Sequence, residues 1–287
     1  MARMAYVNGR FVCQSEAHVS VEDRGFQLSD GAYEVWAVFD GKLVDAEGHF
    51  QRLERSLNAL GIADPMSQAA LTLVLKETVR RNRVRDGTVY LQITRGAAPR
   101  DHAFPSPARR PTVVATARSG DLEAARVRAE QGVKVITTPD IRWGRCDIKS
   151  VALLPNVLAK QAAKAQGAYE AWLVDEEGMI TEGAASNAWI VGQDGALHTR
   201  ELAANILRGV TRSSLAALAR QDGLRVIERP FSVGEAKAAR EAFLTGAGSL
   251  IVPIVQIDDA VIGDGRPGPV ANRLRTLYIQ HGRKTAI

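Results

Sequence analysis

The fold and the chemistry of this chain are decided by residues 140–161, which read DIRWGRCDIKSVALLPNVLAKQ. A polar segment with one lysine, Lys149, separates a strand pattern from the pattern of an amphipathic helix. A lysine at a strand end can lose hydration, and the nearby Arg142 and Arg145 favour its neutral, nucleophilic amine. Lys149 is therefore a candidate catalytic residue, and a surface lysine in a turn is the alternative interpretation.

A second segment, residues 179–190, reads MITEGAASNAWI and places Glu182 at a strand end beside Gly183 and two alanines. Small neighbours leave room for a flat ring. A carboxylate there can keep a pyridine nitrogen protonated, which is what makes pyridoxal phosphate an effective electron sink. On its own, Glu182 also fits an ordinary loop carboxylate.

A third segment, residues 205–212, reads NILRGVTR and turns through Gly209 into a predicted helix. The first amides of that helix, near Val210 and Thr211, can receive a phosphate group. The alternative is that Thr211 serves as an ordinary helix cap.

The first 120 residues give the pattern of an α+β domain. The turn pairs Asn8-Gly9 and Asp40-Gly41 predict two β-hairpins. Apolar spacing predicts one helix around residues 50–60 and a second over about 68–85, and an alternating strand follows at 88–95. That strand leads into a loop rich in glycine and proline, residues 96–107, which contains Arg100 and His102.

A change in composition near residue 120 predicts a domain boundary. We expect an N-terminal α/β domain over residues 1–118, a linker over 119–122, and a C-terminal, barrel-like α/β domain over 123–287 that carries Lys149. Helices are predicted over about 154–166 and 211–221. The short strands of this half come too often in hairpins for a doubly wound sheet.

Composition excludes several classes of protein. The chain has 287 residues, of which 46% are hydrophobic and 24% are charged, and a formal net charge of +5. These values exclude disorder, collagen and small disulfide scaffolds, and the charge is too mild to indicate a nucleic-acid partner. The one dense cationic run, residues 80–85, suits the carbonyl end of a helix.

Cofactor motifs of other kinds are missing from the sequence. It has no Walker lysine loop, no HExxH and no paired Cys or His ligands, so no metal site is predicted. Cys13 and Cys146 cannot form a disulfide framework, which favours a reducing compartment. With no signal-peptide pattern and no apolar run long enough for a membrane span, we expect a cytoplasmic protein with no membrane partner.

Taken together, these segments closely resemble the class IV pyridoxal-phosphate-dependent aminotransferases, and within them the D-amino acid branch. The resemblance runs nearly end to end and also includes EDRGFQLSDGAYEV at 22–35, HFQRL at 49–53, TRGAAPRDH at 94–102 and FLTGAGSLIVPI at 243–254. It implies the two-domain α+β fold of this class (fold type IV), with pyridoxal 5'-phosphate at the domain interface.

The resemblance assigns cofactor roles to individual residues. Lys149 matches the lysine that forms the Schiff base and moves the proton, and Glu182 matches the acid that faces the pyridine nitrogen. Arg52 matches the phosphate-binding arginine, and Val210 and Thr211 match the amides and hydroxyl at the helix start. Tyr169 lies at or near a family tyrosine whose role we leave open.

One phosphate loop departs from the family pattern. Where relatives have a hydroxyl residue, this chain has Gly246, Ala247 and Gly248. The amides of Ala247 and Gly248 can still donate to phosphate, so we expect weaker cofactor retention.

The D-amino acid branch holds the α-carboxylate of its substrate with a tyrosine, an arginine and a histidine, and Tyr33, Arg100 and His102 stand at those positions. A carboxylate leaving water needs charge and donors together, which these three residues supply. Without the family pattern, Tyr33 would be a packing residue and the other two solvated loop residues. Tyr90 and Leu207 are weaker candidates for the substrate side.

The resemblance thus implies ping-pong transfer of an amino group between a D-amino acid, such as D-alanine, and a 2-oxo acid, such as pyruvate or 2-oxoglutarate. It also implies a homodimer in which the arginine and histidine come from the neighbouring subunit. A branched-chain or amine transaminase and aminodeoxychorismate lyase remain alternatives. So does a non-enzymatic carrier of the cofactor, although binding alone needs no carboxylate trap.

Overall fold

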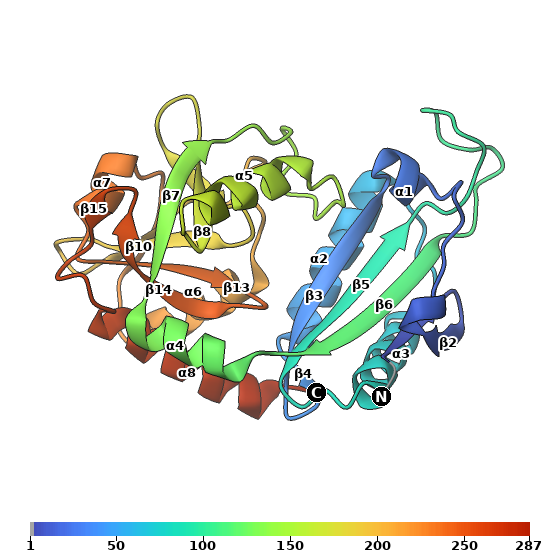
Figure 1. Cartoon of the computed structure of the whole chain (residues 1–287), viewed down its shortest axis with the longest axis horizontal. Coiled ribbons are helices and arrows are strands. Elements are labelled where there is room, and N and C mark those ends of the chain that lie inside the picture. Colours follow the sequence, from blue (N-terminus) through green and yellow to red (C-terminus); the bar gives the residue numbers. More distant parts are fainter. Residues whose placement is uncertain (1–2) are drawn as a thin grey trace. The chain divides into compact units, whose positions relative to one another are not determined.

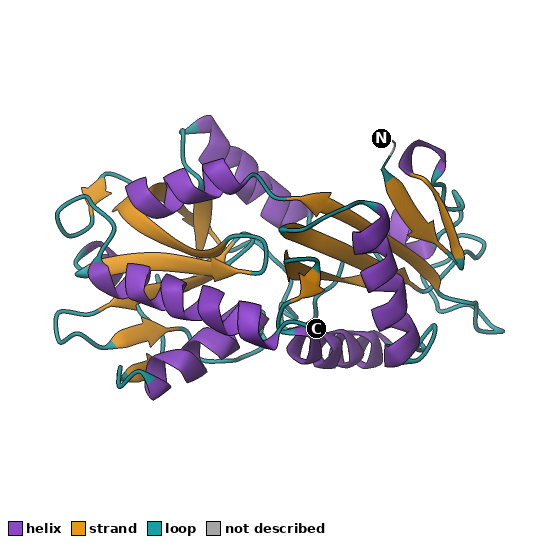
Figure 2. Ribbon diagram, turned by 90° about the horizontal axis from the view of Figure 1, so that it is seen from below, coloured by secondary structure: helices purple, strands orange, loops and turns teal. Residues whose placement is uncertain are grey.

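The computed structural model of the chain describes residues 3–287 and contains two β-sheets, each with helices packed on it (Figures 1 and 2). Contacts divide these residues into two units. Unit 1 comprises residues 3–120, Ile148–Ala152 and Gly282–Ile287, and unit 2 comprises Asp121–Asp147 and Leu153–His281.

Unit 1 contains an antiparallel sheet in the strand order β2-β1-β6-β5-β3-β4. Both predicted hairpins are confirmed, since β1 pairs with β2 around Asn8-Gly9 and β3 pairs with β4 around Asp40-Gly41. All four turn residues have positive φ angles, which asparagine, aspartate and glycine tolerate best. The strands are β1 (Met4–Val7), β2 (Arg10–Cys13), β3 (Gly31–Phe39), β4 (Lys42–Leu43), β5 (Gly87–Thr94) and β6 (Thr112–Ser119).

The core of unit 1 joins one face of this sheet to helices α2 (Ala46–Leu60) and α3 (Gln68–Arg81), while the short α1 (Arg24–Leu28) precedes β3. A 3-10 turn, η1 (Gln14–Glu16), follows β2. Helix α3 ends earlier than predicted. Asn82 follows it and exchanges side-chain hydrogen bonds with the backbone of Met4, and Arg83 takes a left-handed conformation that stops the helix.

Unit 1 also includes two segments from the second half of the sequence. Val151 N donates to Gly31 O (3.0 Å) and Tyr33 N donates to Lys149 O (3.0 Å), so Ile148–Ala152 lies along β3. The C-terminal residue Ile287 exchanges backbone hydrogen bonds with Leu43. These long-range pairings could not be read from composition, which assigned everything after residue 122 to one domain.

Unit 2 contains a mixed nine-stranded sheet in the order β12-β11-β10-β13-β14-β7-β8-β9, with β15 paired to β14. Parallel pairs occur at β11–β12, β14–β7 and β7–β8. The strands are β7 (Val133–Pro139), β8 (Glu170–Val174), β9 (Ile180–Gly183), β10 (Asn187–Val191), β11 (Leu197–Thr199), β12 (Val226–Glu228), β13 (Glu241–Gly246), β14 (Leu250–Ile257) and β15 (Ala260–Val261).

The helices of unit 2 are α4 (Leu122–Gln131), α5 (Leu154–Ala165), α6 (Val210–Gln221), α7 (Val233–Lys237) and α8 (Pro269–Thr285), the last four residues of which belong to unit 1. Figure 1 shows α5 against β7 and β8, where Ala159 and Ala163 join a small apolar cluster. The structure confirms the predicted α5 and α6. Helix α4 was not predicted because none of its residues is buried, so it lacks a clear apolar stripe.

Candidate active site

Lys149 is held by unit 1. Besides the backbone bond from Tyr33, its own N–H donates to Ser56 Oγ on α2 (3.2 Å). Ser150, the next residue, forms a bridge with Ala32 of β3. The backbone of this half-buried lysine is therefore fixed between a strand and a helix, which suits a side chain that must reach one defined point.

The amine of Lys149 lies over an aromatic pair. Its Nζ is 4.1 Å from the centre of the Tyr33 ring, and Tyr33 stacks on Tyr90 at 5.7 Å. Burial, with a smaller contribution from Tyr33, raises the pKa of Tyr90 to about 12, so its phenol stays protonated and donates to Gln92 (2.7 Å). The structure thus brings the predicted catalytic lysine together with the predicted substrate residue Tyr33 and with the weaker candidate Tyr90.

Arg52 forms a buried ion pair within unit 1. Its Nε and Nη2 donate to the two oxygens of Glu34 on β3, at 2.6 and 2.9 Å. His49 Nδ1 lies 2.7 Å from the same carboxylate. Burial alone would raise the pKa of Glu34, but the charge and hydrogen bonds of Arg52, helped by His49, lower it to about 2. This pair, which sequence reasoning missed, fixes the orientation of the Arg52 guanidinium.

Arg100 and His102 lie on the exposed loop that follows β5. Among residues 3–287, their side chains make no hydrogen bond or ion pair with Tyr33 or Lys149. The backbone of this loop, in contrast, is bound by a buried arginine, Arg24. Arg100 and His102, which are proposed to bind the substrate carboxylate, are therefore exposed side chains on a loop whose backbone is anchored.

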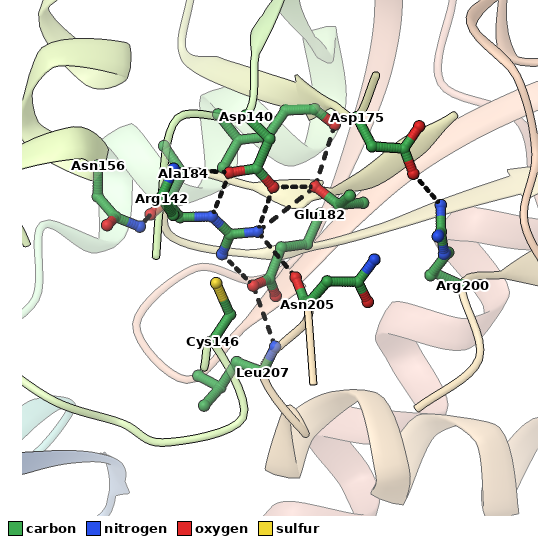
Figure 3. Close-up of polar contacts among 12 residues, drawn as sticks. Asp140, Arg142, Cys146, Asn156, Asp175, Glu182, Ala184, Arg200, Asn205 and Leu207 are labelled. Carbon is green, nitrogen blue, oxygen red and sulfur yellow. Dashed lines mark hydrogen bonds and ion pairs between the residues drawn. The ribbon is translucent and has the colours of Figure 1, made fainter. Parts of the chain in front are cut away.

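Glu182 is buried in unit 2 among polar donors (Figure 3). Arg142 Nη1 and the backbone N–H of Leu207 (3.0 Å) donate to one carboxylate oxygen, and Asn187 Nδ2 donates to the other (2.9 Å). The neighbours Gly183 and Ala184 are small, as the sequence indicated. These donors stabilise the carboxylate anion.

Arg142 connects Glu182 to a second carboxylate, Asp140 (Figure 3). It donates to both oxygens of Asp140, at 2.9 and 2.7 Å, and Thr181 adds a hydrogen bond of 2.7 Å. Burial opposes ionisation at both sites, yet the pairing raises the pKa of Arg142 and lowers that of Asp140. The cluster holds two carboxylates and one guanidinium, so it carries excess negative charge and suits a cationic ligand atom.

Arg142 and Arg145 were expected to favour the neutral amine of Lys149, but the structure pairs both with carboxylates. Arg142 is paired with Asp140 and Glu182, and Arg145 is paired with Asp147 at 2.9 Å on the surface. Both guanidinium charges are therefore compensated by carboxylates of unit 2. Sequence spacing could not show this, because Arg142 and Glu182 are 40 residues apart.

The start of α6 has the features of an anion site. Gly209 is the N-cap and no side chain caps the helix, so Thr211 is not the ordinary cap that was the alternative. A Cβ on Gly209 would lie 1.9 Å from Asn187 Oδ1, so only glycine fits. The buried Thr211 hydroxyl accepts a hydrogen bond from Tyr278 (3.4 Å). Asn187 also donates to Leu207 O (3.0 Å), which links this helix start to Glu182.

The turn between β13 and β14 contains Ala247 and Gly248, the former half-buried and the latter exposed. A Cβ on Gly246 would lie 3.0 Å from Ser249 Oγ. Ser249, which sequence reasoning missed, thus supplies a hydroxyl in the turn that was expected to lack one.

Tyr169, whose role was left open, has a packing role in unit 2. Tyr169 packs against the core of unit 2, with Lys160 and Arg128 over its ring at 4.9 and 5.4 Å. Within residues 3–287, no cluster of three or more His, Cys, Asp or Glu could hold a metal ion. In the same residues, no helix has the length and apolar character that crossing a bilayer requires.

Comparison with known proteins agrees with this geometry. The sequence model of the family "amino-transferase class IV" matches residues 31–257. The D-alanine aminotransferase of Staphylococcus haemolyticus is 38% identical over 271 residues, covering 94% of both chains. That of Bacillus licheniformis is 39% identical over 269 residues, covering 94% of this chain and 93% of the relative.

Solved structures give the same result for the fold. The T.th. branched-chain amino acid aminotransferase, complexed with N-(5'-phosphopyridoxyl)-L-glutamate, superposes with a TM-score of 0.87 at 30% identity, covering 99% and 96% of the two chains. The enzyme of the same name from Escherichia coli gives 0.90 at 24% identity, covering 98% and 95%. The expected family, fold and enzyme class are confirmed: this chain belongs to the class IV aminotransferases.

Proposed function

We propose that this chain is a pyridoxal-phosphate-dependent D-amino acid aminotransferase that exchanges an amino group between a D-amino acid, such as D-alanine, and pyruvate or 2-oxoglutarate. Relatives named D-alanine aminotransferase match 94% or more of the chain at 37–39% identity. The observation that carries the proposal is the Lys149 amine, fixed beside β3 and 4.1 Å from the Tyr33 ring.

The described residues fit this cofactor. Excess negative charge at Asp140, Arg142 and Glu182 suits a protonated pyridine nitrogen, and the uncapped amides at the start of α6 suit a phosphate. The residues that would hold the cofactor are Lys149, Arg52, Glu182, Val210, Thr211, Ala247 and Gly248. When bound, pyridoxal phosphate supplies an electron sink that acidifies the Cα–H bond of the substrate.

The chain's own residues then move and hold protons. Lys149 Nζ accepts the proton from Cα and later returns a proton to the reacting centre. The Tyr33 ring lies within cation–π distance of this amine, at 4.1 Å from the ring centre, so it contributes to positioning the Lys149 side chain. With the cofactor bound, the Glu182 carboxylate would keep the ring nitrogen protonated.

Substrate choice is assigned to Tyr33, Arg100 and His102. A guanidinium, an imidazole and a phenol together replace the water lost by the α-carboxylate. Fixing the carboxylate also fixes which Cα–H bond faces Lys149, and thereby the stereochemistry. A branched-chain aminotransferase is the second candidate, because the superposed structures include several enzymes of that name.

The test is a comparison of donors with protein reconstituted with pyridoxal phosphate. We expect the yellow cofactor to bleach on addition of D-alanine and not of L-alanine or L-leucine. The variant Lys149→Ala should not bleach, whereas Lys76→Ala, at an exposed lysine on α3, should react like the wild type. Bleaching by L-leucine alone would support the second candidate and overturn the first.

We also propose a homodimer in which Arg100 and His102 serve the partner's substrate site. Large apolar side chains are exposed on both units, including Val21 (75%), Phe26 (72%) and Leu154 (68%), and a partner subunit that covers them would bury this apolar surface. Mixing inactive Lys149→Ala protein with Arg100→Ala protein, which should bind D-alanine weakly, should raise activity at low D-alanine above that of either protein alone if subunits share sites. A monomer in sedimentation would contradict the proposal. The free cysteines Cys13 and Cys146 support a cytoplasmic location.

A further inference from the structure

Arg24 is a buried arginine in unit 1, only 2% exposed, at the start of α1. Its two terminal nitrogens donate to three consecutive carbonyl oxygens of the loop after β5. Nη1 donates to Asp101 O (2.6 Å) and Ala103 O (3.1 Å), and Nη2 donates to His102 O (3.3 Å). One guanidinium therefore binds the peptide groups on both sides of His102 and the one that follows Ala103.

Asp30 holds Arg24 in this position. Its Oδ2 accepts from Arg24 Nε (2.8 Å), and the same carboxylate accepts two hydrogen bonds from Arg95, at 2.7 and 3.0 Å. Arg95 in turn donates to Leu60 O (2.6 Å) and Gly61 O (2.9 Å) at the end of α2. The loop carbonyls are thus connected, through two guanidinium groups and one carboxylate, to the helical layer of unit 1.

The first residues of the loop are fixed separately. Thr94 Oγ1 donates to Asp23 Oδ2 (2.8 Å), Ala98 N donates to Glu22 O (3.1 Å), and Ala97 forms a bridge with Asp23. Residues 99–104, in contrast, are all exposed. An exposed stretch gains little from apolar burial, so its restraints are the hydrogen bonds from Arg24 and the contact of Phe104 with the Arg95 guanidinium, which lies 3.6 Å from the ring centre.

We propose that Arg24, held by Asp30, is a positioning residue that fixes Arg100 and His102 for the α-carboxylate of the substrate. The inference rests on the proposed function, which assigns the carboxylate to those two side chains. Arginine is required because its planar fork binds Asp30 and three carbonyls at once, whereas a lysine offers a single ammonium group. Arg24 acts through the backbone and need not touch the substrate.

The decisive variant is Arg24→Lys, which keeps the charge beside Asp30. We expect KM for D-alanine to rise about tenfold, because the binding loop loses its order. We expect kcat to change by less than about twofold, because the reacting groups keep their positions. The rate with a primary amine that lacks a carboxylate should stay unchanged. In an Arg100→Ala, His102→Ala background, Arg24→Lys should have no further effect on KM, and a full tenfold rise there would overturn the proposal.

Arg95→Lys is the comparison variant. It also removes a guanidinium from Asp30 and loses the contact of Arg95 with Phe104, but it leaves the contacts from Arg24 to the loop carbonyls on both sides of His102. We expect both variants to lower the unfolding midpoint and only Arg24→Lys to raise KM. An equal rise in Arg95→Lys would show that loosening of the whole network, and not Arg24, is responsible, and would overturn the assignment.

A readout without catalysis separates this inference from the proposed function. Amide hydrogen exchange across residues 98–107 and tryptic cleavage after Arg100 should both accelerate in Arg24→Lys, with or without bound pyridoxal phosphate. Unchanged exchange and cleavage would overturn the positioning role. Failure of the wild type to use any D-amino acid would overturn the proposed function, while the exchange comparison would still decide whether Arg24 orders the loop.

Discussion

Each unit has a buried arginine that is paired with carboxylates, and the pairing differs between the two. In unit 1, Arg52 is paired with the carboxylate of Glu34. Burial is the main cause that lowers the pKa of the neighbouring His49, so this histidine stays neutral. In unit 2, Arg142 faces two carboxylates, Asp140 and Glu182. The first cluster is electrically balanced, and the second carries excess negative charge.

The difference separates a cluster whose carboxylate is compensated within the protein from one that still favours a cation. A balanced buried pair has its charge satisfied internally, and removing one partner leaves the other uncompensated. An unbalanced cluster still favours a cation, which a protonated ring nitrogen would supply. Identical substitutions in the two clusters should therefore have different consequences.

The largest effect is expected from Glu182→Gln. Loss of the excess negative charge should lower kcat for D-alanine about 100-fold or more, because the ring nitrogen is no longer held protonated. Stability should fall less than in the matching unit 1 variant, since Arg142 keeps Asp140. Steady-state kinetics and urea denaturation measure both quantities, and activity within twofold of the wild type would contradict the role given to Glu182.

In unit 1, Glu34→Gln should lower the free energy of unfolding by about 3 kcal/mol, because the buried Arg52 loses the carboxylate that compensates it. Urea denaturation measures the loss. The double variant Glu34→Gln, Arg52→Met should recover part of it, since removal of both charges leaves no unpaired ion. A double variant that is less stable than Glu34→Gln would argue against a balanced pair.

The acid stability of the protein should reflect the same pair. The pKa of Glu34 lies near 2 in the folded chain against an ordinary value of 4.5, so the stabilisation is complete above pH 4.5 and is lost as the pH falls toward 2. The difference corresponds to about 3 kcal/mol. Burial also lowers the pKa of His49, so protonation of this histidine in the unfolded chain begins the decline below pH 6.5. Urea midpoints should be measured for the wild type and for Glu34→Gln from pH 6.5 to pH 2. Below pH 4.5, the midpoint of the variant should decline much less than that of the wild type.

The smallest effect is expected at Glu77, which shares a pKa near 2 because Arg80 and Arg81 donate to it on the surface of α3. Solvent screens these exposed pairs, so Glu77→Gln should leave the unfolding midpoint unchanged. Its acid denaturation curve should overlay that of the wild type. A loss as large as that of Glu34→Gln would mean that burial does not distinguish the two carboxylates.

Local sequence features predicted local structure well. Asn8-Gly9 and Asp40-Gly41 specified their hairpins because few residue pairs tolerate two consecutive positive φ angles. Predictions weakened where tertiary contacts determine the end of an element. Helix α3 ends at Arg81 because Asn82 bonds to the backbone of Met4, a residue 78 positions away.

The amino-acid sequence by itself determined the family, the hairpins and the identity of the candidate residues, because motif spacing and turn chemistry are properties of neighbouring residues. Only the tertiary structure decided that the Lys149 segment pairs with β3, that Arg142 joins Glu182 to Asp140, and that Arg24 binds the loop of Arg100 and His102. Arg24 and His102, for example, are 78 residues apart. The partner of a buried charge is whichever group the folded backbone brings within hydrogen-bonding distance, and no short-range pattern encodes that choice.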